Sequence, residues 1–132
     1  MNPFIIISLL FLSFGMSQQE YNINDLMEID NGLWTEKFSD IPITGKVFGF
    51  FGENKPYKKV HMGNLRNGKK EGKWVIWYVK GGIEKETHWE NNLLDGKYRE
   101  WYKNGQVRVN GSYNAGIKTG RWEYWYEDGT KR

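Results

Sequence analysis

One segment of the sequence comes close to a phosphate-binding loop. Residues 63–70 (GNLRNGKK) match the pattern GxxxxGK[ST] at every position but the last. A phosphate-binding loop needs a hydroxyl there to hold Mg²⁺, and a helix must follow it. Lys70 supplies no hydroxyl, and no helical pattern follows it in the sequence. We therefore interpret Asn67-Gly68 as a tight turn and not as part of a nucleotide site.

The other polar residues do not form a recognisable catalytic or metal-binding set. The chain has two histidines, His61 and His88, whereas zinc needs three or four ligands and a histidine base needs a nucleophile and an orienting partner. Glu84 and Glu86 lie two residues apart, but glycosidase chemistry would also need a cleft. The absence of cysteine excludes disulfides and thiol nucleophiles. We predict a protein that is not an enzyme and needs no cofactor or metal.

Three tryptophans form the most promising candidate surface. Trp77, Trp101 and Trp125 recur every 24 residues on an otherwise polar face of the expected strands, which places them about 9.6 Å apart in a sheet. With Arg99 and Arg108 beside them, they could bind a peptide, a glycan or single-stranded nucleic acid by stacking. The alternative is structural, with basic side chains lying across the rings to complete a thin core through cation–π contacts.

The tryptophans belong to an internal repeat. The pattern Gly-(Lys/Arg)-aromatic-x-x-Trp-Tyr starts near residues 72, 96 and 120, and a turn glycine follows each tyrosine after three residues. A looser copy starts near residue 45. Alternating apolar and polar residues between Asn-Gly and Asp-Gly turns are typical of hairpins. We predict an all-β protein, a single-layer antiparallel sheet of consecutive β-hairpins with one apolar and one wet face.

The turns also predict how the strands pair. We expect two-residue turns at both ends of every hairpin, for example at Asn104-Gly105 and Ala115-Gly116. In this register, the three tryptophans face, in order, Glu84, Arg108 and Arg132. We further expect the glycines at positions 72, 96 and 120 to make room for a neighbouring ring on the apolar face.

The repeat resembles the MORN-repeat variant family (membrane occupation and recognition nexus) over residues 45–132. The resemblance rests on the pattern Gly-(Lys/Arg)-aromatic-x-x-Trp-Tyr-x-x-Gly and the Asn-Gly turns, and residues 32–45 are similar to the lead-in before the first repeat of such proteins. It implies a hairpin array without catalytic residues. Relatives are often antitoxins of toxin–antitoxin pairs, and MORN repeats in general act as scaffolds or membrane-associated modules.

The first seventeen residues have the layout of a secretory signal peptide. The uncharged apolar run 4–14 (FIIISLLFLSF) precedes Gly15-Met16-Ser17, which places small residues before a cut at Gln18. Eleven helical residues reach only about 16 Å, against the roughly 30 Å of a bilayer core. An uncleaved anchor is the alternative, because no Lys or Arg precedes the run. We expect a secreted or periplasmic protein with its mature chain starting near Gln18.

The predicted organisation is a signal peptide (1–17), a lead-in and cap (18–44) and a repeat array (45–132). Leu33–Phe38 is expected to be the strand that covers the open end of the array. Residues 1–45 hold one basic and six acidic residues (net −5), and residues 46–132 hold 18 basic and 10 acidic residues (net +8). We expect a non-catalytic module for protein–protein interaction or scaffolding, with no small-molecule substrate. The alternatives are an antitoxin-like neutraliser of a protein toxin and a binder of anionic membranes or nucleic acid.

Overall fold

The computed structural model describes residues 18–132, which form an all-β structure with one short 3-10 turn, η1 (Ile23–Asp25). Eight strands make one sheet in the order β1-β4-β5-β6-β7-β8-β9-β10. The predicted sheet of consecutive strands is confirmed, and the predicted signal peptide lies outside the described residues. The strands are β1 (Glu20–Asn22), β2 (Leu26–Glu28), β3 (Trp34–Glu36), β4 (Gly45–Phe51), β5 (Lys58–Arg66), β6 (Lys69–Trp77), β7 (Ile83–Glu90), β8 (Leu93–Trp101), β9 (Val107–Asn114) and β10 (Ile117–Tyr124).

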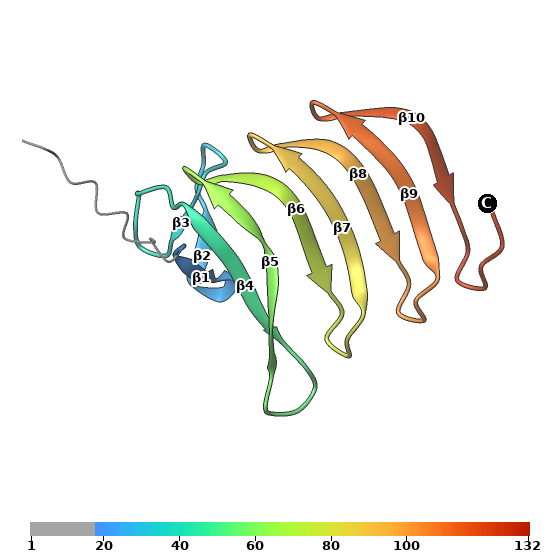
Figure 1. Cartoon of the computed structure of the whole chain (residues 1–132), viewed down its shortest axis with the longest axis horizontal. Helices are drawn as coiled ribbons and strands as arrows, with labels where there is room; N and C mark the ends of the chain where they lie inside the picture. The colour runs from blue at the N-terminus through green and yellow to red at the C-terminus, as the bar shows by residue number, and fades with distance from the viewer. Residues whose placement is uncertain (1–17) are drawn as a thin grey trace, which may run out of the picture.

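The sheet is antiparallel from β4 to β10 and is curved along its strands (Figure 1). Figure 1 shows each strand beside the next, from β4 in green to β10 in red, with no second layer over β8 to β10. The N-terminal residues 18–44, here called the cap, lie over the first part of the sheet, from β4 to the turn between β7 and β8. The sheet therefore has one partly covered face, which we call the cap face, and an opposite face, which we call the open face.

The turns between repeats follow the prediction. Asn67-Gly68, Asn91-Asn92 and Ala115-Gly116 each connect two paired strands through two residues. Both residues of each turn have positive φ, from 46° at Ala115 to 83° at Gly116. Such values match the twist of a type I′ hairpin.

The turns within repeats correct the predicted register. The Tyr102 N–H donates to the Gln106 carbonyl (2.8 Å) and the Gly105 N–H to the Tyr102 carbonyl (2.9 Å), so three residues form this turn and not two. Trp101 then faces Val107, and Arg108 is the extra residue of a β-bulge before the next pair. The extra turn residue shifts the register by one, and the bulge restores the alternation. In place of Glu84, Arg108 and Arg132, the tryptophans face Ile83, Val107 and Lys131.

The expected role of the repeat glycines is wrong for Gly72 and Gly120, whereas a Cβ added at Gly96 would lie 3.3 Å from the His88 side chain. A Cβ added at Gly72 or Gly120 would meet no other atom within 4 Å, and both residues have positive φ. Gly72 and Gly120 allow a backbone conformation that other residues rarely adopt. The space for the tryptophan rings comes from other glycines. A Cβ at Gly63 would lie 2.2 Å from Trp74, and one at Gly111 would lie 2.3 Å from Trp122.

The end of the sheet is covered by a strand that sequence analysis did not identify. β1 pairs with β4 in parallel, aligning Tyr21 with Val47. Leu33–Phe38 does not cover the edge, because only β3 within it is extended and β3 pairs with β2 in a separate two-stranded sheet. Together the cap and the first strands bury one apolar cluster, formed by Tyr21, Leu26, Ile43, Val47, Met62, Leu65 and Trp74.

Candidate binding surfaces

The three repeat tryptophans lie on the open face, and we call them the Trp ladder. Cross-strand pairing places Trp74, Thr87, Tyr98 and Gly111 on one face, which is the cap face because Trp74 packs into the cap cluster. Strand alternation then places Trp77, Trp101 and Trp125 on the other face. Each of the three residues is half-buried. The three tryptophans therefore share one face of the sheet, and the Trp77 Nε1 is buried without a hydrogen-bond partner among the described residues.

Basic side chains cover the Trp ladder less than expected. Lys131 lies over Trp125, with its Nζ 5.8 Å from the ring centroid. Among the described residues no cation lies over Trp77 or Trp101. Arg132, expected beside Trp125, instead lies 5.2 Å from the ring of Tyr126.

The two predicted arginines are separated by the bulge. Arg99 stays on the open face, where its Nε donates to the Asn110 Oδ1 at 3.2 Å. Arg108, as the bulged residue, reaches Glu100 with its guanidinium at 3.1 Å. Since Glu100 lies on the cap face, only Arg99 joins the Trp ladder.

A row of tyrosines holds the Trp ladder in place, and sequence analysis did not assign it this role. The Tyr78 hydroxyl donates to the Trp101 carbonyl (2.6 Å), and the Tyr102 hydroxyl donates to the Trp125 carbonyl (2.9 Å). Burial raises the pKa of Tyr78, so the hydroxyl stays protonated and able to donate. The invariant Trp-Tyr pair in the repeat was the available signal for this link.

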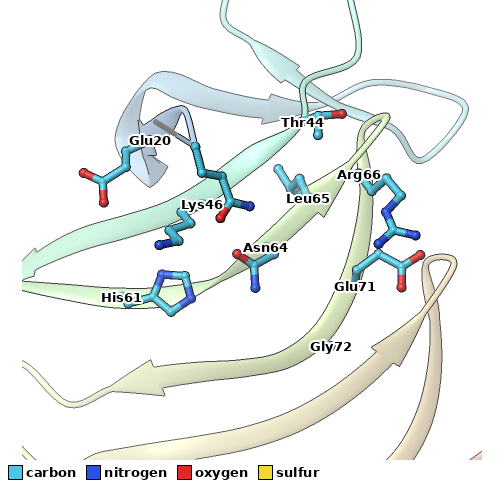
Figure 2. A pocket seen from close by; sticks show the side chains of 10 residues that line it. Glu20, Thr44, Lys46, His61, Asn64, Leu65, Arg66, Glu71 and Gly72 are labelled. Carbon is cyan, nitrogen blue, oxygen red and sulfur yellow. The ribbon is translucent and has the colours of Figure 1, made fainter. Parts of the chain in front are cut away.

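A polar groove of about 750 Å³ continues the open face across β1, β4, β5 and β6 (Figure 2). Figure 2 shows Lys46, Asn64 and His61 side by side on neighbouring strands. None of these was predicted, because the parallel pairing of β1 cannot be read from the repeat. The groove is lined by Gln18, Glu20, Thr44, Lys46, His61, Asn64, Leu65, Arg66, Glu71 and Gly72.

Basic groups are in excess in this groove. Glu20 forms an ion pair with Lys59 at 2.5 Å. The hydrogen bond from Lys59 and its positive charge lower the pKa of Glu20. Glu71 accepts a hydrogen bond from the Asn91 N–H at 3.0 Å. Among the described residues, Lys46 and Arg66 have no carboxylate within ion-pair distance. The groove can therefore attract an anionic group.

On the cap face, three tryptophan rings surround Lys70, at the start of β6. The Lys70 Nζ lies 5.3 Å from the ring centroid of Trp34, 4.9 Å from Trp74 and 4.6 Å from Trp89. Burial lowers the pKa of Lys70, against the opposing charge of Glu28. This contact joins the cap to the first two hairpins.

The last repeats carry an aromatic cluster on the same face without a cap above it. Tyr98, Tyr113 and Trp122 pack with ring centroids 5.2 to 5.6 Å apart, and Tyr124 stacks on Trp122 at 6.4 Å. The Lys118 Nζ lies 4.3 Å from the Trp122 centroid. Because the sheet is one layer thick here, these rings are only half-buried and Tyr124 is 36% exposed.

A charged centre borders the aromatic cluster. Glu100 accepts a hydrogen bond from the Tyr98 hydroxyl and lies 3.3 Å from Lys85 and 3.1 Å from Arg108. Burial alone would raise the pKa of Glu100, but the hydrogen bond and the two cations outweigh it and lower the pKa. Glu100 is thus held as a carboxylate between two basic side chains.

The described residues contain no group of three or more acidic or histidine side chains that could hold a metal ion. Within the same residues, no helix is long and apolar enough to cross a membrane. Comparisons of the chain with family models, with curated proteins and with solved structures find no match. The similarity to the MORN-repeat variant family therefore rests on the repeat pattern alone.

Proposed function

We propose that this chain is a non-catalytic repeat module, of the MORN-variant kind, that docks a partner protein outside the cytoplasm. The observation that carries the proposal is the Trp ladder, one half-buried tryptophan in each of the repeats that start near residues 72, 96 and 120, on the face opposite to the cap. Aromatic side chains with accessible faces are the residues that most often dominate protein interfaces. A protein toxin that is itself exported is one partner that would fit.

The geometry of the Trp ladder supports docking of an extended surface. The tyrosine hydroxyls of Tyr78 and Tyr102 tie each hairpin to the next, so the three rings are held on one rigid sheet. Rigid aromatic groups lose little side-chain entropy when a partner binds. Arg99 adds a polar group beside Trp101, fixed by its bond to Asn110.

The test is photo-crosslinking from the open face. A photoreactive residue replaces Lys97, which is exposed and pairs with Ser112 on that face, and the chain is mixed with the extracellular fraction of the cells that make it. We expect one discrete adduct, displaced by unlabelled wild-type chain but at least about tenfold less well by a Trp77→Ala, Trp101→Ala double variant. Equal displacement by both chains would overturn the proposal.

A second candidate function is binding to an anionic surface, and the groove with Lys46 and Arg66 favours it. Residues 46–132 carry a net charge of +8, which adds long-range attraction to phosphate-bearing membranes or nucleic acid. Binding to phosphatidylserine vesicles or to single-stranded DNA should then weaken steeply with salt. A Lys46→Gln, Arg66→Gln variant should lose most of it, and unchanged binding by this variant would exclude the groove.

A further inference from the structure

The cap face is covered over its first half and uncovered over its second half. In the covered half, backbone groups of the cap contact the first two of the three inter-repeat turns. The Trp34 N–H donates to the Gly68 carbonyl (2.8 Å), and the Asn92 Nδ2 donates to the Gly32 carbonyl (2.9 Å). Between these two contacts, the Trp34 ring lies over Lys70. The cap thus docks as an extended segment that carries one tryptophan.

The third repeat presents the same arrangement without a cap. Lys118 is the equivalent of Lys70, 48 residues later, and Trp122 is the equivalent of Trp74. Lys118 contacts Trp122 as Lys70 contacts Trp74. No second described ring lies in cation–π contact with Lys118, and this lysine is exposed whereas Lys70 is half-buried.

The surface under the cap continues into this third repeat. Leu65, Trp89 and Tyr113 occupy equivalent positions, 24 residues apart, on three successive hairpins. Leu65 is buried beneath the cap, and Trp89 packs against the edge of the cap cluster. Tyr113 lies one hairpin further and belongs to the uncovered cluster with Trp122. The uncovered cluster is therefore an extension of the established cap interface.

The charges of the two sides are complementary. Residues 18–44 hold six acidic residues and one basic residue, a net charge of −5. The uncovered part of the cap face offers the cations of Lys85, Arg108 and Lys118, of which Lys85 and Arg108 flank Glu100. An acidic segment would gain favourable electrostatics on this surface, as Glu28 of the cap does beside Lys70.

We propose that the uncovered cap face of β8–β10 docks an acidic, extended, tryptophan-bearing segment of a partner protein, seated as the cap is seated on the first repeat. The partner tryptophan would stack on Lys118, beside Trp122 and Tyr113. This inference goes beyond the proposed function and adds a second docking surface. It uses the face opposite to the Trp ladder, so the two can fail separately.

The experiment uses the mature chain and a labelled peptide of the cap sequence, EIDNGLWTE (residues 28–36), which carries Trp34 and three acidic residues. Fluorescence anisotropy measures binding to the wild-type chain, to Lys118→Glu and to Lys97→Glu. The two variants change the charge equally, but Lys97 lies on the open face. We expect saturable binding that Lys118→Glu weakens at least about tenfold and Lys97→Glu leaves unchanged.

The peptide carrying Trp34→Ala should bind at least about tenfold more weakly than the parent peptide. The proposal is overturned by absence of binding up to about 1 mM, by equal effects of the two lysine variants, or by equal binding of the alanine peptide. Sedimentation of the chain alone measures whether it forms a dimer and is a further test. A dimer that Lys118→Glu dissociates would assign this surface to a second copy and overturn the proposed occupant. Loss of peptide binding with crosslinking at position 97 intact would leave the proposed function standing.

Discussion

Large rings on the cap face are matched to small residues on the neighbouring strand. Trp74 lies over Gly63 and Trp122 lies over Gly111, where even a Cβ would clash. In the middle repeat, the smaller Tyr98 faces Thr87, which is buried. The ring size and the size of its partner thus vary together along the array. In a thin sheet this matching replaces the side-chain interdigitation of a two-layer core.

The first prediction tests this matching. Gly111→Ala would place a methyl group 2.3 Å from the Trp122 ring, so the ring must move out of its site. We expect a loss of about 1–3 kcal/mol in the free energy of unfolding, as for overpacked cores. Chemical denaturation followed by Trp fluorescence measures it. The control is Ser112→Ala on the open face, which should cost less than about 0.5 kcal/mol; equal costs would contradict the packing described here.

The second prediction concerns Glu100. Its pKa is lower in the folded chain than the ordinary value of 4.5, so the unfolded chain binds the proton more readily. The stabilisation is therefore complete above the unfolded pKa and is lost as pH falls through the folded pKa. Glu100→Gln should flatten the decrease of stability below about pH 5. Thermal unfolding at several pH values tests this, with Glu90→Gln, an exposed carboxylate, as the control; a wild-type slope in Glu100→Gln would contradict it.

At the scale of elements, the hairpins are joined by side chains that cross from one repeat to the next. The Tyr102 hydroxyl reaches the Trp125 carbonyl, and the Asp95 carboxylate accepts the Ala115 N–H at 3.0 Å. Glu71 makes the same contact to the Asn91 N–H. Each hairpin therefore holds the turns of the next at both ends, and the Trp ladder keeps its spacing.

The third prediction measures one such link. Tyr102→Phe removes the hydrogen bond to the Trp125 carbonyl and should lower the free energy of unfolding by about 1 kcal/mol. Tyr126→Phe is the matched control, because the Tyr126 hydroxyl has no hydrogen-bond partner among the described residues. Urea denaturation of both variants gives the comparison. A cost for Tyr126→Phe as large as that for Tyr102→Phe would show that ring packing, and not the link, is lost.

The repeat pattern predicted the strands and the inter-repeat turns because both depend on local signals. Asn67-Gly68 and Ala115-Gly116 form the two-residue turns expected of them. The turns within repeats use three residues even where they contain a two-residue turn signal, as at Asn104-Gly105 and Asp128-Gly129. The choice between such closely related hairpins is decided by tertiary pairing. The third turn residue moves Arg108 out of the position opposite Trp101. The parallel strand β1 and the groove beside it carry no repeat signal, so they could not be predicted.

At the scale of the molecule, the charged residues and the part of the sheet covered by the cap are unevenly distributed. The acidic cap covers the start of a basic sheet, and the last hairpins have both faces uncovered by other described elements (Figure 1). The groove near Lys46 and the Trp ladder share the open face, whereas the aromatic cluster with Trp122 lies on the cap face. The described residues therefore form two chemically different exposed surfaces, one on each face of the sheet.

The fourth prediction concerns export, which rests on the apolar run 4–14 and the small residues before Gln18. Intact-mass and N-terminal analysis of the native protein should find a chain that starts near Gln18. The expected location is the extracellular or periplasmic fraction. Recovery of the chain with Met1 in the cytosolic fraction would contradict export, and a membrane-bound chain with Met1 would indicate an uncleaved anchor.

The central claim is that the Trp ladder is the docking surface, and ¹⁹F NMR of the 5-fluorotryptophan-labelled chain tests it most directly. The seven tryptophans give separate resonances that Trp→Phe variants assign, and the crosslinked partner is then added in purified form. We expect the resonances of Trp77, Trp101 and Trp125 to shift together while those of the buried Trp74 and of Trp89 stay in place. Shifts confined to Trp122 on the cap face, or no shift in the ladder at saturating partner, would contradict the claim.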